Sequence, residues 1–404
     1  MNSGHSHAHP RPGRSPASAR SRNVLLALTL ALLTATVIGL VSLWPDADSR
    51  PDRAAMLGPG VVVHSAEVTS VPESTDPTTS LLVEAVGRSS EIVDEEVQVE
   101  VTPEVAADGI HPGDRIRILA IAEAGPEQPF YYFDHERTLP LGLLFLVYLL
   151  VVAIVARGAG LRAILGLTAG VAIVVGFMLP AILTGEHAVL VALVASSAMI
   201  FPCVYFAHGV SVRTTTAVLG TFGGVAITVL AVLAAGRPAG MTGADGEAAQ
   251  LLAGTHEGLS LPAIFLAGVI ISGLGALNDV TITQASSVWE LRAAMPSASR
   301  WKVFSSAMRI GRDHIASTVY TLAYAYIGSA LPVLLFASTL ERSLLGTVTA
   351  GEISAEVFRT LIASIGLVLA IPLTTAIAAL LATSTERPLR RSRRQVLAER
   401  LGES

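Results

Sequence analysis

The chain alternates between long apolar runs and short polar connections. Eight of the apolar runs are long enough to cross a bilayer, because about 20 helical residues span roughly 30 Å of hydrocarbon. They lie at residues 24–43, 139–156, 161–183, 187–206, 214–234, 260–280, 315–337 and 357–382. We therefore expect a polytopic α-helical membrane protein with about eight transmembrane helices.

Residues 45–137, between the first two apolar runs, follow a different pattern. Hydrophobic and polar residues alternate there in four short stretches, separated by turn-forming residues, at 61–68, 81–86, 97–101 and 115–119. Alternation with period two predicts antiparallel strands. The segment is long enough for one small all-β domain, and we expect a barrel or sandwich of the OB type. We interpret the following aromatic stretch, 130–133, as a belt at the membrane interface.

These patterns divide the chain into five parts. They are a disordered tail rich in His, Arg and Pro at 1–23, an anchor helix at 24–43, the β-domain at 45–137, a seven-helix domain at 139–383 and a basic tail at 384–404. A cleaved signal peptide is the alternative interpretation of 24–43, since basic residues precede it. Its apolar run is longer than the usual 7–15 residues and no A-x-A site follows Trp44, so we favour an uncleaved anchor.

Composition and charge support the same architecture. Hydrophobic residues make up 51% of the chain, charged residues 15%, and the mean hydropathy of +0.60 is typical of membrane proteins. Eighteen of the 27 Lys and Arg residues lie in the two tails and in the connections at 156–162, 207–213 and 281–313. With eight spans these all fall on one side, so both termini are predicted to be cytoplasmic and the β-domain extracytoplasmic.

Asp279 is the strongest candidate for a functional residue. It stands beside Asn278 at the end of the sixth apolar run, where a carboxylate costs roughly 2.5–3.5 kcal/mol unless it is paired, protonated or hydrated. Its position 17 residues after Pro262 predicts a place at the inner end of a straight helix. Thr281, Thr283 and Gln284 continue this polar stretch and predict a wet cavity or a re-entrant segment. We take Asn278, Asp279, Thr281, Thr283 and Gln284 as the centre of a solute- or ion-binding site.

Polar residues beside other apolar runs complete this candidate site: His208, Arg312, Asp313 and His314. In the functional hypothesis Arg312 neutralises Asp279 and His314 titrates beside it. In the alternative, Arg309 and Arg312 bind anionic lipid phosphates and fix the topology, and His208 is merely hydrated. The spacing of Trp301, Phe304 and Met308 predicts an amphipathic helix at 299–310 in the inner interface.

Two local patterns bear on helix packing. Leu165-Gly166-x-x-x-Gly170 recurs as Leu219-Gly220-x-x-x-Gly224, and such spacing lets helices approach closely. The recurrence is either a duplication of two spans or a chance match. Pro332 and Pro372 each remove a helical hydrogen bond, which either kinks the helix or frees carbonyls for a cation.

Several chemistries are not indicated. The chain contains no G-x-x-x-x-G-K-[ST] loop, no H-E-x-x-H, no G-x-S-x-G and no paired cysteines, since Cys203 is its single cysteine. We predict no enzymatic activity, no catalytic residue, no metal site and no cofactor. The basic run 387–394 directly follows an apolar run, which favours anionic lipid over nucleic acid as its partner.

Several motifs resemble those of the YibE/F family of bacterial membrane proteins. They are Asp134-His-Glu-Arg137, Ala207-His-Gly209, Thr214-Thr-Thr216 with Leu219-Gly-Thr221, Gly273-Leu-Gly-Ala-Leu-Asn-Asp-Val-Thr-Ile-Thr-Gln284, Ile310-Gly-Arg-Asp-His-Ile-Ala-Ser-Thr318 and Pro372-Leu-Thr-Thr375. The resemblance covers about 60–383 and implies a bacterial plasma-membrane protein with an extracytoplasmic domain. The family has an acidic residue where Asn278 stands here, and the resemblance brings no substrate or reaction.

Two functional hypotheses follow. The first is a solute or ion transporter with its polar site near Asn278 and Asp279. The second is a non-transporting scaffold or receptor whose β-domain binds a cell-envelope partner. The predicted partners are the lipid bilayer, anionic lipid, an unknown solute or ion, and either an envelope partner or a second copy of the chain.

Overall fold

The computed structural model describes residues 19–46, 60–72, 80–89, 92–107, 109–121, 130–256 and 258–382. These belong to two compact units, one formed by Asp52–Arg157 and the other by Met1–Pro51 together with Gly158–Ser404. Residues 1–18 of the predicted N-terminal tail and the whole predicted basic tail at 384–404 lie outside the described residues. Each unit is described by itself.

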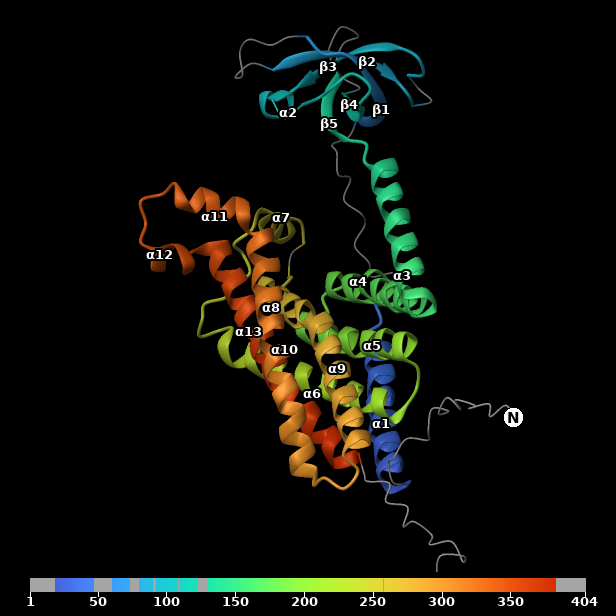
Figure 1. Cartoon of the computed structure of the whole chain (residues 1–404). Helices are drawn as coiled ribbons and strands as arrows, with labels where there is room; N and C mark the ends of the chain where they lie inside the picture. Colours follow the sequence, from blue (N-terminus) through green and yellow to red (C-terminus); the bar gives the residue numbers. More distant parts are fainter. Residues whose placement is uncertain are drawn as a thin grey trace, which may run out of the picture. The chain divides into compact units, whose positions relative to one another are not determined.

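The first unit contains a five-stranded closed barrel (Figure 1). Its strands are β1 (Val61–Ser70), β2 (Leu81–Gly87), β3 (Glu96–Val101), β4 (Arg115–Ile121) and β5 (Phe130–His135), and the short helix α2 (Pro103–Ala107) lies between β3 and β4. The order around the barrel is β1-β2-β3-β5-β4, with β1 antiparallel to β4 and β3 parallel to β5. The barrel that the alternating pattern predicted is confirmed.

The barrel core follows from the alternation of residues along its strands. Val83, Val99, Ile116 and Ile118 are fully buried, while their sequence neighbours Glu84, Glu100 and Arg117 turn outward or lie at the edge of the core. Successive side chains of a strand point to opposite faces, so each apolar set fills the interior. Burying apolar side chains in this way is the main stabilising contribution to such a small domain.

The interpretation of residues 130–133 as an interfacial belt was wrong, because they form β5. Tyr131 and Tyr132 pair with Leu119 and Ile118 of β4, and Phe130 pairs with Val99 of β3. Phe130 and Tyr132 also pack against the barrel core. Without β5 the parallel pairing with β3 that closes the barrel would be missing.

Helix α3 (Thr138–Ile173) follows β5 and changes direction at Arg157, whose backbone has φ 51° and ψ −137°. A left-handed φ is unusual for a residue with a side chain, so the helix is interrupted there. Before Arg157, α3 buries no residue against protein, and its buried residues are Gly160, Gly166 and Gly170. The predicted connection between the runs 139–156 and 161–183 therefore coincides with a break.

The second unit is helical. It contains α1 (Ala19–Ser42), the π-helix η2 (Val174–Met178), α4 (Leu179–Leu183), α5 (Ala188–His208), α6 (Val212–Ala235), α7 (Glu247–Thr255), α8 (Leu261–Ser272), α9 (Leu274–Ala294), α10 (Arg300–Ser329), α11 (Leu331–Ser338), α12 (Leu344–Val348) and α13 (Gly351–Leu381). Helices α6, α9, α10 and α13 lie side by side (Figure 1). Their apolar core includes Val218, Leu277, Leu367 and Ile371, and Ile270 of α8 belongs to the same core.

Six helices among the described residues are long and apolar enough to cross a membrane, or seven if α10 and α11, bent by 67°, count as one span. The sequence predicted eight. The difference lies in Thr138–Leu183, a single run of 46 residues that the sequence divides in two. Pro332 stands at the beginning of α11, so the predicted break in the seventh run is present, whereas α13 continues through Pro372.

Two helices extend beyond the predicted apolar runs. The amphipathic helix predicted at 299–310 is present as the first third of α10, in which Val303, Ala307 and Gly311 bury one continuous face. The polar stretch after Asp279 is not a re-entrant segment, since α9 continues as a helix to Ala294. In both places the buried face of the helix extends beyond the apolar run.

A seam of small residues joins α6 to α13. A Cβ atom added to Gly220 would overlap Thr374, one added to Gly366 would overlap Thr228, and one added to Gly224 would lie 3.0 Å from Ala370. The pairs run in opposite directions along the two helices, so the helices are antiparallel and in close contact. Gly166 and Gly170 of α3 similarly face Cys203 of α5. Both glycine pairs noted in the sequence thus serve close helix packing.

Candidate functional site

The predicted site residues on α9 separate into a buried and an exposed set. Thr281 is fully buried, and its Oγ1 lies 2.7 Å from Oγ1 of Thr221 on α6. Gln284 is 1% exposed, and its Nε2 donates to the backbone oxygen of Ala307 on α10 at 2.9 Å. Both residues satisfy their hydrogen bonds within helix contacts, so they join helices α6, α9 and α10 rather than line a cavity.

Asp279 lies on an exposed face of α9, and Asn278 and Thr283 beside it are half-buried. The side-chain oxygen Oδ1 of Asn278 is buried without a hydrogen-bond partner in the described part of the chain. Asp279 lies deeper than the sequence predicted. Leu277 packs against Gly224 and Thr281 bonds to Thr221, so Asp279 is level with the middle of α6.

The predicted pair between Asp279 and Arg312 is not formed among the described residues. Arg312 and Asp313 are exposed on α10 and His314 is half-buried, while their neighbour Gly311 packs against Gln284. The charge of Asp279 acts instead on His208 at the end of α5. The rotation of α10 about its axis explains why Asp279 and Arg312 do not pair. Gly311 faces α9, so the next residue, Arg312, points away from α9.

His208 lies within a small group of charges contributed by four helices. Besides Asp279, the charges of Arg213 on α6 and Arg162 on α3 act on it. These residues belong to two separate polar connections and one apolar run of the sequence. His208 and Asp279, two of the predicted site residues, are thus within electrostatic range of each other, although no hydrogen bond or ion pair joins them in the described part of the chain.

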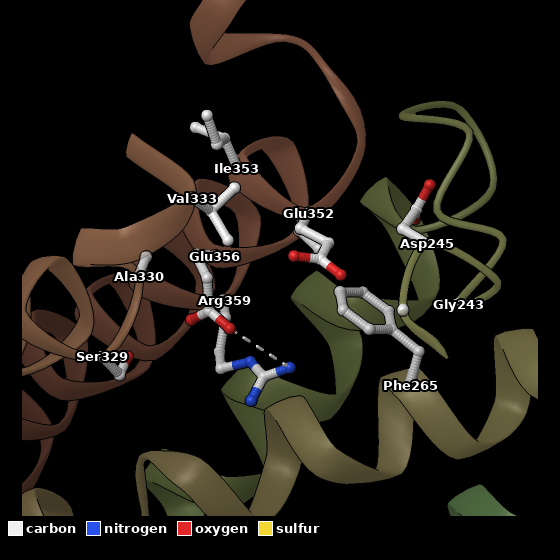
Figure 2. A pocket seen from close by; sticks show the side chains of 12 residues that line it. Gly243, Asp245, Phe265, Ser329, Ala330, Val333, Glu352, Ile353, Glu356 and Arg359 are labelled. Carbon is white, nitrogen blue, oxygen red and sulfur yellow. Dashed lines mark ion pairs between the residues drawn. The ribbon is translucent and has the colours of Figure 1, made fainter. Parts of the chain in front are cut away.

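A pocket that the sequence did not indicate lies where α13 begins, at the end of α6 opposite to His208. Figure 2 shows the side chains that line it. Its volume is about 340 Å³. Its walls come from the loop after α6, from α8, from the junction of α10 and α11, and from the first turns of α13. The polar lining residues are Asp245, Ser329, Glu352, Glu356 and Arg359, and Phe265 covers one side.

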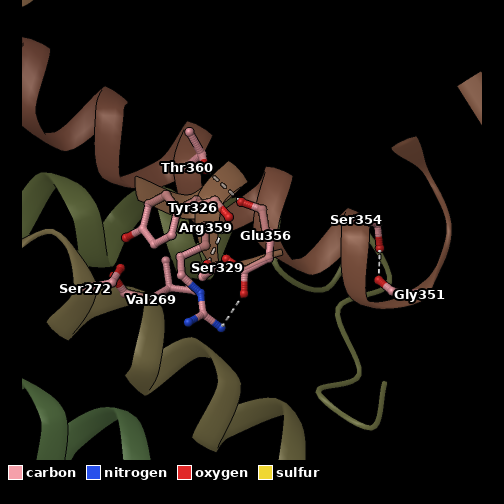
Figure 3. Close-up of polar contacts among 9 residues, drawn as sticks. All are labelled: Val269, Ser272, Tyr326, Ser329, Gly351, Ser354, Glu356, Arg359 and Thr360. Atoms are coloured by element: carbon pink, nitrogen blue, oxygen red, sulfur yellow. Dashed lines mark hydrogen bonds and ion pairs between the residues drawn. The ribbon is translucent and has the colours of Figure 1, made fainter. Parts of the chain in front are cut away.

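Glu356 and Arg359 form the most constrained part of this pocket. Arg359 Nη2 lies 3.9 Å from Glu356 Oε1, and both side chains are less than one-third exposed. The guanidinium also lies 5.7 Å from the centre of the Phe265 ring, a cation–π arrangement. Figure 3 shows the pair beside Tyr326 and Ser329.

Each member of this pair keeps one polar atom without a partner. Glu356 Oε2 and Arg359 Nε are both buried and make no hydrogen bond in the described residues. An unsatisfied buried polar atom costs about 1–3 kcal/mol, more if it is charged. A polar ligand bound in the pocket would remove that cost, so the pocket has the properties of a binding site.

The sequence contained a signal for this pocket that was overlooked. Glu352, Glu356 and Arg359 are spaced at i, i+4 and i+7, which places them on one helical face. The predicted span began at 357 and left the two glutamates outside it, whereas α13 begins at Gly351. No local pattern brings Asp245 and Phe265 to this face, because that contact depends on the packing of the helices.

The barrel unit carries a second hollow of about 490 Å³, where β5 leads into α3. It is lined by Asp114, Arg115, His135, Glu136 and Arg137, among others. Nearby, the hydrogen bond from Arg137 lowers the pKa of Asp134. Partial burial, followed by the charge of Asp134, raises the pKa of Tyr132, whose hydroxyl lies 2.6 Å from Nδ1 of His135.

The long apolar helices, packed through small residues and internally bonded hydroxyls, define a multi-pass membrane protein. The model of the YibE/F-like protein family matches residues 144–384, more than half of the chain. The chain therefore belongs to the YibE/F-like family, as the sequence motifs indicated. No curated protein and no solved structure matches the chain.

Proposed function

We propose that this YibE/F-like protein is a transporter for a small solute or ion. The observation that carries the proposal is the half-buried pair of Glu356 and Arg359, which lines a pocket among the membrane helices with one unpartnered polar atom on each residue. Ionisable groups in membrane helices are costly, and their usual role is to serve a substrate or ion pathway. The proposal includes no enzymatic step.

A second charged region supports transport rather than binding alone. The pocket and the pair of His208 and Arg213 lie toward opposite ends of α6, which begins at Val212 and ends at Ala235, and Asp279 is level with the middle of this helix. In the topology favoured by the basic residues, the pocket opens to the extracytoplasmic side and His208 lies near the cytoplasm. Alternating access exposes one central site to each side of the membrane in turn, and Asp279 lies between these two polar ends.

The depth of Asp279 favours the same function. In a straight sixth span it would be an interfacial carboxylate, but it is level with the middle of α6, where the cost of a charge in hydrocarbon is greatest. We propose that Asp279 couples transport to a proton or another cation. Its exposed position leaves it free to change partners during the cycle.

Flux into proteoliposomes tests the proposal. The full chain is reconstituted and uptake of small cations, amines and anions is measured with and without a pH gradient. We expect Glu356→Gln to reduce uptake at least tenfold and Asp279→Asn to abolish its dependence on the gradient. The matched control is Glu290→Gln, because Glu290 is an exposed carboxylate of α9 outside both regions.

The second candidate function is a scaffold or receptor. The observation that favours it is the polar hollow of the barrel, which has its own core and its own charged lining. In this case a cell-envelope partner or a second copy of the chain would bind the barrel. Absence of flux for every solute, with specific capture of such a partner by the barrel unit, would replace transport with this function.

A further inference from the structure

An apolar groove adjoins the charged pocket. It has a volume of about 190 Å³ and lies between α10 and α13, with Tyr326, Ile327, Leu334, Val357 and Leu361 in its walls. The groove and the pocket share the lining residues Ala330, Ile353 and Glu356. The two hollows are therefore adjacent, and Glu356 lies at the boundary between a charged part and an apolar part.

The charged part of this cavity is negative. It contains three carboxylates, those of Asp245, Glu352 and Glu356, and one guanidinium, that of Arg359, which gives a formal charge of −3 + 1 = −2. The guanidinium of Arg359 already forms an ion pair with Glu356 and a cation–π contact with Phe265. Asp245 and Glu352 make no ion pair within the described ranges. A cationic group fits this part of the cavity, and an anionic one does not.

The apolar groove lies against the outer surface of the helices. Ile327 is 49% exposed and Leu361 is 58% exposed, and in a bilayer such surfaces of α10 and α13 contact acyl chains. A ligand with an apolar tail would therefore reach the cavity sideways from the lipid. A small hydrophilic ion would leave the groove without a function.

We propose that the cavity takes an amphipathic organic cation, with its ammonium group at Glu352 and Glu356 and its apolar tail in the groove between α10 and α13. The unpartnered Oε2 of Glu356 accepts a charge-assisted hydrogen bond from the ammonium group. The tail fills the groove beside Ile327 and Val357, in the place that a lipid acyl chain would otherwise take. This assignment names the substrate class for the proposed transporter and rests on that function for the transport step only.

Equilibrium binding to the full chain in phosphatidylcholine nanodiscs tests the assignment. The probes are radiolabelled octylammonium, methylammonium and octanoate, and the signal of empty nanodiscs is subtracted to remove partitioning into lipid. We expect saturable binding of octylammonium at least tenfold tighter than that of either other probe. Equal affinity for methylammonium, or tighter binding of octanoate, overturns the assignment.

Two variants separate the two parts of the site. Glu356→Gln should weaken octylammonium binding at least tenfold, and Ala323→Trp, which fills the groove, should weaken octylammonium while leaving methylammonium unchanged. Glu290→Gln is the control and should bind as the parent does. A variant set without these differences overturns the assignment, provided that each variant elutes as the parent does in size-exclusion chromatography.

The flux assay distinguishes failure of this assignment from failure of the proposed function. Glu356-dependent uptake of methylammonium, with no saturable binding of octylammonium, would support a transporter and refute the amphipathic substrate. Saturable, Glu356-dependent binding of octylammonium without flux of any probe would support the site and refute transport.

Discussion

At the scale of single residues, glycine determines how closely α6 and α13 approach. Thr374 lies over Gly220 and Thr228 lies over Gly366, so each glycine leaves space for a threonine of the facing helix. Close backbone approach gives many dispersion contacts, which stabilise helix pairs in a medium where burial of apolar surface contributes little.

We predict that Gly220→Ala lowers the apparent free energy of unfolding in detergent by about 1–3 kcal/mol, because the new methyl group overlaps Thr374. Gly275→Ala in α9 is the matched control, since nothing lies within 4 Å of a Cβ added there. Thr374→Ala in the Gly220→Ala background should recover part of the loss. Equal unfolding free energies of the two glycine variants would contradict the close contact of α6 and α13 at Gly220.

The ion pair of Asp134 and Arg137 makes a pH-dependent contribution to the barrel. Because the pKa of Asp134 is lowered in the folded state, its contribution is present above the ordinary value of 3.8 and is lost as the pH falls through the lowered pKa. We predict that Arg137→Gln raises the pKa of Asp134, and an NMR titration of its carboxyl carbon measures this. An unchanged titration would show that Arg137 does not bind Asp134 in solution.

At the scale of elements, the barrel depends on a strand that is far from its partner in sequence. β5 pairs with β3 in parallel, and β4 lies between them along the chain. The aromatic residues of β5 are common both in strands and at membrane interfaces, and the apolar run that follows 130–133 favoured the interface in the sequence.

We predict that a fragment of residues 46–137 folds alone, with a strand-rich far-UV circular dichroism spectrum and a cooperative thermal transition, because the barrel has its own core. A second fragment that ends at residue 128 lacks β5 and should show no such transition. Cooperative melting of the shorter fragment would mean that β5 does not close the barrel.

The long helices extend beyond the apolar runs that predicted them. The apolar run 315–337 predicted a span but not its full helix, because α10 begins at Arg300 and its first third is amphipathic. Hydropathy marks the part of a helix that lipid can cover, whereas the helix continues wherever another helix buries one of its faces.

At the scale of the whole molecule, the segregated basic residues predict the topology. In a Cys203→Ser background, cysteines at Glu95, Gln250 and Ser343 should react with an impermeant maleimide added outside cells. Those at Ser211 and Ser297 should react only after permeabilisation. All five positions are exposed in the structure, so accessibility to the reagent depends on the side of the membrane. Labelling of Ser297→Cys from outside would overturn the predicted orientation.

The sequence alone determined the class of protein, the barrel and the family. Helical spans and strands leave periodic patterns, because the hydrogen bonds of their backbones and the environment of their side chains repeat along the chain. The break at Pro332 and the close packing of Gly220 and Gly224 were also legible, since each follows from the covalent structure of one residue.

Only the tertiary structure decided which polar residues share a site. Thr281 and Gln284 form hydrogen bonds to other helices, Asp279 makes no ion pair with Arg312 among the described residues, and the pocket of Glu356 and Arg359 includes residues more than one hundred positions apart. The rotation of each helix about its axis fixes these neighbours. That rotation depends on packing against all the other helices at once, and no single stretch of the sequence specifies it.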